Sequence, residues 1–136
     1  MQLVNRYRCN DPAKYLIYQE QILNVIQNTI TKLKKTNIIK SFYFFPYHMG
    51  EAKIKKLSFI DGITCYRNIH QKQYDNYAKE NNLKIIAMRI FGGDKKIIKK
   101  NNLKKLIFFN LRNKLVKKII VGINSKNQLD QLIKIS

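Results

Sequence analysis

Segments with helical and strand-like periodicity alternate along the whole chain, and this order restricts the folds open to it. Apolar residues at helical spacing predict helices at about 11–35, 51–57 and 71–81, a further one within 95–118, and a last one at 125–135. Runs rich in β-branched and aromatic residues predict strands at 38–45, 59–66, 83–90 and 118–123. Strands that alternate with helices form parallel sheets joined by crossover helices. The sequence therefore predicts an α/β fold with a parallel sheet of four strands, or five if residues 2–4 add a short one.

Length and cysteine content limit the class of protein further. The chain has 136 residues, 45% of them apolar, which suits a single domain spanning 1–136 with its own core. Cys9 and Cys65 are far apart and have no CxxC or Cys/His cluster, so we expect no metal site and no disulfide framework. A reducing, cytoplasmic compartment is the expectation. Apolar runs are too short for a membrane span, and the first residues do not resemble a signal peptide.

The charge of the chain has two explanations. It carries 27 basic and 8 acidic residues, a formal net charge of +19, which favours nucleic acid or another polyanion as a partner. Yet the basic residues are 22 Lys and only 5 Arg, beside 21 Ile and 15 Asn, as an AT-rich genome would produce. The stretch from Lys95 to Lys118 has nine Lys, one Arg and no acid. Its apolar stripe, with Leu103, Leu106, Ile107 and Leu111, predicts a helix with a charged outer face, through which nucleic acid would bind.

The segment VKKIIVGINSKNQLDQLIKI, near the end of the chain, joins a predicted strand to a predicted helix. Such a corner can bind an anion, because the first N–H groups of a helix are unpaired and carry a partial positive charge. Glycine in the corner would allow a ligand to approach the backbone closely. The alternative is that the serine only caps the helix and the lysine is a solvated charge. The candidate binding residues are Gly122, Asn124, Ser125, Lys126 and Asn127.

Four phrases, LKKTNIIKSFYFF, FIDGITCYRNI, LKIIAMRIFGG and KKIIVGINSKNQLDQLI, together resemble the second half of the aldo-keto reductase family. The resemblance runs from about Asp11 to Ile135. It implies the last four strands of a (β/α)₈ barrel that uses NADP(H), and hence a half TIM-barrel-like parallel sheet of about four to five strands with crossover helices. It also implies that the corner from Gly122 to Asn127 holds the phosphates on the adenosine side of the cofactor.

The chain departs from the family pattern where the nicotinamide would bind. Phe45 and Pro46 stand where family members have a Ser-Asn pair that holds the carboxamide. The expected glutamine on the next strand falls at Thr64, and the aromatic residue that stacks on nicotinamide falls at Met88. The family's catalytic Tyr, Lys, Asp and His belong to the first half of the barrel. The resemblance therefore implies no catalytic residue in this chain and no carbonyl reduction by the chain alone.

Other polar residues give weaker signals. His48 and His70 follow predicted strands, and Asp61 and Asp75 supply carboxylates, but no pair has the spacing of a catalytic site. Gly92-Gly93 could bring backbone N–H groups close to a phosphate, or could simply form a turn that requires positive φ.

Half a barrel has a physical consequence, because a barrel of ordinary tilt needs about eight strands to close. Two sheet edges would remain open. We therefore expect a homodimer of half-barrels, a complementing chain that supplies the N-terminal half-barrel, or a marginally stable remnant. Two functions stay open: an aldo-keto-reductase-like partial domain with a residual NADP-phosphate site, and a basic RNA-binding or ribosome-associated protein whose affinity falls steeply with salt.

Overall fold

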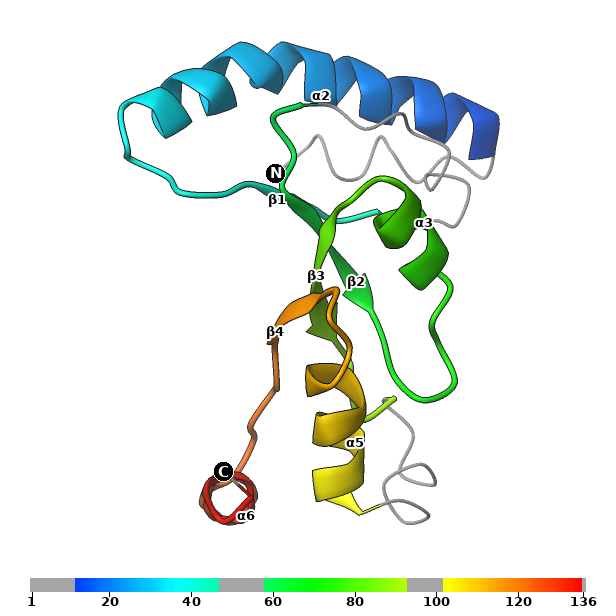
Figure 1. Cartoon of the computed structure of the whole chain (residues 1–136), viewed down its shortest axis with the longest axis vertical. Helices are drawn as coiled ribbons and strands as arrows, with labels where there is room; N and C mark the ends of the chain where they lie inside the picture. The colour runs from blue at the N-terminus through cyan, green and yellow to red at the C-terminus, as the bar shows by residue number, and fades with distance from the viewer. Residues whose placement is uncertain (1–11, 47–57, 93–101, 136) are drawn as a thin grey trace.

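The computed structural model describes residues 12–46, 58–92 and 102–135. Within them four strands form one sheet, namely β1 (Tyr43–Phe44), β2 (Gly62–Tyr66), β3 (Lys84–Met88) and β4 (Val116–Ile119). All neighbouring strands are parallel, and they lie in the order of the sequence, β1-β2-β3-β4. The predicted α/β fold with a half-barrel-like parallel sheet is therefore confirmed, and the sheet is open (Figure 1).

Four helices accompany the sheet: α2 (Pro12–Lys35), α3 (Asp75–Glu80), α5 (Leu103–Leu111) and α6 (Lys126–Ile133). The crossovers from β2 to β3 and from β3 to β4 contain α3 and α5, respectively. The long helix α2 lies across one end of the sheet, whereas α5 and α6 lie toward the other end (Figure 1). The predicted helix at 51–57 and the predicted strand at 2–4 lie outside the described residues. In the part of the chain that the structure describes, none of the helices has the length and apolar character needed to cross a bilayer.

The two faces of the sheet differ in burial. Side chains of paired residues in parallel strands point to the same side, so each pair in the register marks one face. The paired residues Ile63 and Ile85 are fully buried, as are Cys65 and Ala87. The intervening residues, Thr64 with Ile86 and Tyr66 with Met88, are only partly buried. One face of the sheet is thus covered far more completely than the other.

Helices α3 and α5 cover the buried face together. Arg67, the residue after β2, donates hydrogen bonds to Asp75 of α3 and to Asn110 of α5, each at 2.8 Å. The Arg67 side chain and Asn110 are almost fully buried. Leu106 and Ile107 of α5 are also buried. This agrees with the rule that crossovers of one hand place successive helices on the same side of a sequentially ordered sheet.

The C-terminal end of helix α2 is bonded to the residues that precede β1 and β2. Ile26 and Ile30 pack against the core, as the helical spacing predicts. Near the helix C-terminus, the Lys34 ammonium donates to the carbonyl of Phe59 at 2.8 Å and to the carboxylate of Asp61 at 2.5 Å. The same carboxylate accepts the Phe42 N–H at 2.6 Å. Asp61 therefore joins the end of α2 to the chain just before β1.

All four observed strands are shorter than predicted: β2 and β3 lie inside the predicted ranges 59–66 and 83–90, and the other two strands differ more. The strand predicted at 38–45 is only Tyr43–Phe44, because the Phe42 N–H bonds the Asp61 side chain and Ile38 is 68% exposed. The strand predicted at 118–123 is Val116–Ile119, with one further ladder bond from the Ile120 N–H to the carbonyl of Ala87. The chain then leaves the sheet. The segment from Val121 to the start of α6 is therefore a connection and not a strand, which corrects the prediction.

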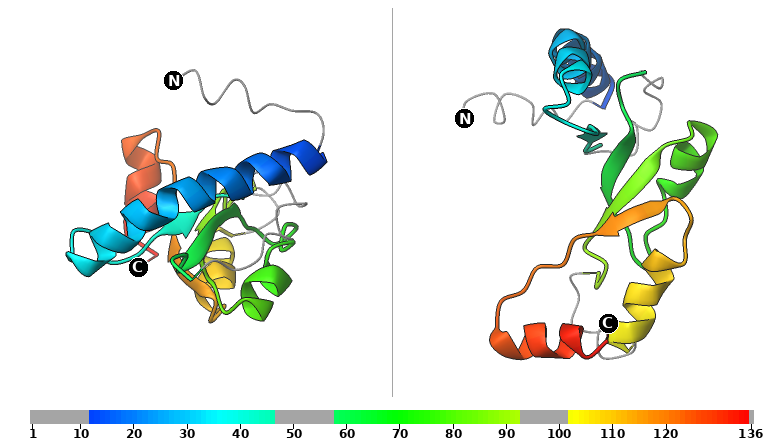
Figure 2. Two further views of the ribbon diagram at one scale, coloured as in Figure 1. Left: turned by 90° about the horizontal axis from the view of Figure 1, so that it is seen from above. Right: turned by 60° about the vertical axis from the view of Figure 1, so that its left-hand side comes forward.

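Helix α6 lies apart from the sheet at the end of this connection (Figure 2). None of the residues in the helix itself is buried. Leu132 and, just beyond the helix, Ile135 pack against the core, whereas Leu129 and Ile133 are 42% and 61% exposed. Much of the apolar side of α6 therefore faces solvent in this chain.

Candidate functional site

The five residues predicted to bind an anion form one continuous exposed corner. Gly122, Asn124, Ser125, Lys126 and Asn127 are all exposed, and they lie between the end of β4 and the first turn of α6. The corner follows the carboxyl end of its strand, which is the end of parallel strands where barrel proteins bind ligands. The position of these residues is as the sequence predicts, although the strand before them ends earlier.

Ser125 caps α6, as the simpler interpretation of the sequence predicts. Its hydroxyl accepts the N–H of Gln128 at 3.3 Å, and the Gln128 side-chain oxygen accepts the N–H of Asn124 at 2.8 Å. This arrangement resembles a capping box, and it satisfies the backbone N–H groups of Asn124 and Gln128. Lys126 and Asn127 are the first two residues of the helix, whose N–H groups have no partner within a helix. The corner can therefore present these two amides, with the Lys126 ammonium, to an anion.

Gly122 has open space around it. A Cβ atom built there would meet no heavy atom within 4 Å, so no contact inside the described structure requires glycine at this position. A small cavity of about 140 Å³ lies beside it. The described residues that line this cavity are all uncharged: Phe91, Leu103, Val121, Gly122, Gln128, Gln131 and Leu132. The cavity is suited to an apolar or amide group, and a phosphate would instead bind outside it, on the helix N-terminus.

The residues where a nicotinamide would bind do not suit it. Pro46 is buried and has no N–H, and its carbonyl accepts the Tyr74 hydroxyl at 3.4 Å. The Phe45 ring packs edge-on against Tyr66, with the ring centroids 5.6 Å apart. Thr64 and Met88 contribute one hydroxyl and one thioether in place of an amide and an aromatic ring. The first turn of α6 thus offers groups that an anion could contact, whereas the side chains at these four positions lack the groups that the family resemblance would require for a nicotinamide.

Arg89 is a residue at this end of the sheet that the sequence interpretation missed. It follows β3 directly, and its guanidinium carbon lies 4.3 Å from the centroid of the Tyr66 ring. Its φ of 50° is unusual for a residue with a side chain and marks a constrained backbone. The side-chain amide of Asn68 donates to the Arg89 carbonyl at 3.5 Å. The apolar pattern of 83–90 predicts extended backbone throughout, so it could not predict the left-handed conformation of Arg89.

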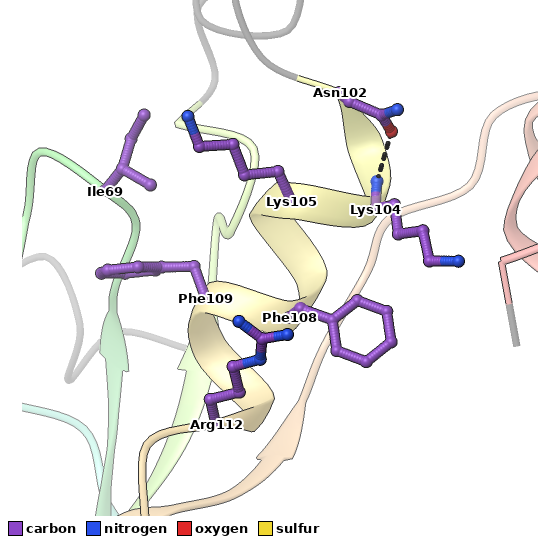
Figure 3. Close-up of a pocket in the computed structure, with 7 residues that line it drawn as sticks. All are labelled: Ile69, Asn102, Lys104, Lys105, Phe108, Phe109 and Arg112. Carbon is purple, nitrogen blue, oxygen red and sulfur yellow. Dashed lines mark hydrogen bonds between the residues drawn. The ribbon is translucent and has the colours of Figure 1, made fainter.

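A second basic surface covers the outer side of α5 (Figure 3). It borders an open groove of about 630 Å³, lined by Ile69, Asn102, Lys104, Lys105, Phe108, Phe109 and Arg112. This groove contains part of the basic stretch from Lys95 to Lys118, of which residues 95–101 lie outside the described residues. The sequence predicted the charged outer face but not the two phenylalanine rings within it. Phe108 lies four residues from both Lys104 and Arg112, and Phe109 lies four residues from Lys105. Residues four apart are neighbours on a helix, so this spacing could have revealed the cluster of cations and rings.

The remaining candidates have structural roles. Asp61 and Asp75 each form an ion pair, with Lys34 and Arg67 respectively. The backbone N–H of His70 donates to the Asn68 side chain, and the His70 side chain is exposed. Gly92 has a φ of 76°, so the turn interpretation is correct at that residue. His48 lies outside the described residues. Among the described residues, none of the groupings of His, Cys, Asp and Glu is sufficient to hold a metal ion.

Cys65 is equally unsuited to chemistry. The side chain is 1% exposed, and burial raises the pKa of its thiol from 9.0 to about 12, with a further increase from the charge of Asp75. Only the thiolate is a good nucleophile, and at neutral pH almost none forms here. The thiol therefore acts as a small apolar group in the core.

The structure defines the class of protein as α/β, with an open, sequentially ordered parallel sheet and basic groups on the loops and helices that follow its strands. Comparison with protein-family models, with curated proteins and with solved structures gives no match.

Proposed function

We propose that this chain is an aldo-keto-reductase-like partial domain that binds the phosphates of NADP(H) and does not reduce carbonyls alone. The observation that carries the proposal is the strand order β1-β2-β3-β4 with every pair parallel. In a doubly wound sheet the strand order reverses at some point, whereas barrel strands follow one another around the wall. A sequential parallel sheet agrees with the second half of such a barrel, as the four sequence phrases imply.

The uneven burial of the sheet supports the same proposal. In a (β/α)₈ barrel one face of the sheet carries the helices and the other lines the interior. Here the face with Ile63, Cys65 and Ile85 is fully covered, while Thr64 and Ile86 on the opposite face remain partly exposed. The partly exposed face would line the interior of a completed barrel.

Phosphate binding is assigned to Lys126 and Asn127. Their backbone amides begin α6, and the exposed Lys126 side chain adds a positive charge at the same point. Gly122 would leave room for a ligand to approach the connecting backbone. The departures at Phe45, Pro46 and Met88 argue against productive binding of the nicotinamide, so we assign the chain no step of hydride or proton transfer.

A complementing first half, wherever it is encoded, would supply the other wall of the barrel and any catalytic residues. We favour a complementing half with acidic character over a second copy of this chain. Two copies, each with a formal net charge of +19, would repel each other. We place the complex in the cytoplasm, because two widely spaced cysteines give no disulfide framework, as is usual for proteins of a reducing compartment.

Calorimetric titration with NADPH tests the proposal. We expect saturable binding that Lys126→Ala weakens about tenfold, as loss of a charge-assisted phosphate contact would. Lys134→Ala is the matched control, because Lys134 is also exposed and caps the other end of α6. NADH, which lacks the additional phosphate, should bind more weakly than NADPH. The affinity for NADPH should tolerate added salt better than binding to a short RNA.

The proposal fails if NADPH does not bind, or if Lys126→Ala and Lys134→Ala weaken binding equally. Equal losses would mean that NADPH is attracted by the general positive charge of the protein and not by the corner.

A further inference from the structure

The outer part of α5 combines exposed positive charge with two phenylalanine rings that are partly exposed. Leu106, Ile107 and Asn110 point toward the sheet and are buried. The opposite side of the helix carries Lys104, Phe108 and Arg112 at intervals of four residues, with Lys105 and Phe109 beside them. Residues four apart on a helix are neighbours on its surface. Cations and partly exposed rings therefore alternate on the two outer sides of α5, and all of them line the groove of about 630 Å³.

Every ring in this surface lies close to cations. The Phe108 ring centroid is 5.9 Å from the Lys104 ammonium and 5.7 Å from the Arg112 guanidinium. The Phe109 centroid is 4.8 Å from the guanidinium of Arg67 and 5.5 Å from the ammonium of Lys72. Figure 3 shows Phe109 and Lys105 pointing toward Ile69, and Phe108 and Lys104 projecting from the other side of α5.

Among the residues that the structure describes, no acidic side chain lines the groove. Asp75, which reaches Arg67 near Phe109, is already neutralised by two hydrogen bonds of 2.8 Å from that arginine. A ligand in the groove would therefore encounter positive charge and ring faces together. Aromatic faces that accept bases, set among cations that hold a phosphate backbone, are the usual platform for single-stranded nucleic acid. A duplex would not use the rings, because its bases are already stacked inside the helix.

We propose that the outer face of α5 binds single-stranded nucleic acid, with an unpaired base stacked on Phe108 or Phe109 and phosphates held by Lys104, Lys105 and Arg112. This activity is separate from the corner at Gly122 to Asn127 and does not rest on NADP(H) binding. The sequence alone allowed any polyanion as the partner of the basic stretch from Lys95 to Lys118. This proposal restricts the partner to a nucleic acid with unpaired bases.

Fluorescence anisotropy with a short labelled single strand tests the proposal on the full chain. Phe108→Leu removes the ring but keeps an apolar side chain, and it should weaken binding at least about fivefold without changing the salt dependence. Lys104→Gln with Arg112→Gln removes two phosphate contacts. This double variant should weaken binding and reduce the slope of log affinity against log salt by about 1.4. Circular dichroism and thermal unfolding verify that each variant is folded.

Two matched controls separate this site from general attraction. Lys79→Gln with Lys84→Gln changes the net charge equally at exposed residues outside the groove, and it should reduce affinity less than the groove variant. A strand of the same length without bases should bind more weakly to the unmodified protein, and Phe108→Leu should leave that affinity unchanged. Strands of RNA and DNA with one sequence, compared in parallel, identify which of the two the protein prefers.

The proposal would be overturned by two results together. The first is that the groove variant (Lys104→Gln with Arg112→Gln) and the control variant (Lys79→Gln with Lys84→Gln) weaken binding equally. The second is that neither Phe108→Leu nor Phe109→Leu affects binding. Equal affinity for the strand with bases and the strand without them would also overturn it. Either result would mean that the phosphates are attracted by diffuse charge alone.

Discussion

Arg67 and Asp75 form a two-point ion pair, in which Nε and Nη2 of the arginine each donate to a different carboxylate oxygen at 2.8 Å. The third donor of the guanidinium, Nη1, bonds the Asn110 side chain at 2.8 Å. Asn113 also donates to Asp75, at 3.2 Å. Since the Arg67 side chain is 3% exposed, this network holds a buried charge at the point where β2, α3 and α5 meet.

Replacement of Asp75 by asparagine should destabilise the fold strongly. Removal of one partner of a buried pair leaves the other charge uncompensated, at a cost of about 3–5 kcal/mol. Chemical denaturation should therefore show a much lower free energy of unfolding for Asp75→Asn than for Asp130→Asn, which changes an exposed residue of α6. Equal stabilities of the two variants would contradict the structural role of the pair.

Stability should fall at alkaline pH because of Cys65. Its folded-state pKa is raised from 9.0 to about 12 by burial and by the Asp75 charge, so the folded protein retains a proton that the unfolded chain releases. The stability contribution is complete below pH 9.0 and is lost as the pH rises toward about 12. The pKa values of Tyr77 and Tyr43 are raised as well, mainly by burial, and act in the same direction.

The measurement is the free energy of unfolding across this pH range, in a Cys9→Ser background that leaves one thiol. Cys65→Ala should show a flatter decline, with a difference in slope of up to about 1.4 kcal/mol per pH unit. Parallel pH profiles for the two proteins would show that the Cys65 thiol is not the responsible group.

Two glycines should respond differently to the same substitution. A Cβ atom at Gly62 would overlap the Lys84 carbonyl and the Tyr43 ring, so Gly62→Ala should lower stability by about 1–3 kcal/mol. Gly122→Ala should leave stability almost unchanged, because no described heavy atom would lie within 4 Å of the added Cβ. If a cofactor phosphate approaches the backbone there, Gly122→Ala should nevertheless weaken NADPH binding. Thermal unfolding measures the stability of both variants, and calorimetry measures NADPH binding by Gly122→Ala. Strong destabilisation by Gly122→Ala would contradict the finding that the space around Gly122 is open.

The sequence predicts features that depend on local pattern. The apolar spacing of Ile26 and Ile30 identified the buried side of α2, and the β-branched residues Ile63 and Ile85 identified two central strands. The parallel arrangement followed from the alternation of strands and helices. These features were predictable because each arises from residues close together in the chain.

Features that depend on distant partners were not predictable in this way. The residues before Tyr43 have strand-like composition, yet the Phe42 N–H bonds Asp61, which no local pattern reveals. Leu111 was expected within the apolar stripe of its helix, but it is the last residue of α5 and is 50% exposed. The position of Arg89 over Tyr66 depends on a left-handed backbone at a strand end.

The assembly state follows from the open sheet and the charge. The isolated 16.2 kDa chain should be monomeric at low salt, where copies repel, and should begin to associate as salt screens that repulsion. Sedimentation velocity over a salt series measures this. A monomer of high stability at every salt concentration would contradict the half-barrel proposal, since no second half would be needed to cover the sheet.

The most direct test of the phosphate site is an amide NMR titration of the isotope-labelled chain with NADPH. We expect the amide resonances of Lys126 and Asn127 to shift first and saturate, with smaller changes at Gly122 and little change on α5. Shifts confined to Lys104, Lys105 and Arg112, or no saturable shifts at all, would contradict this expectation.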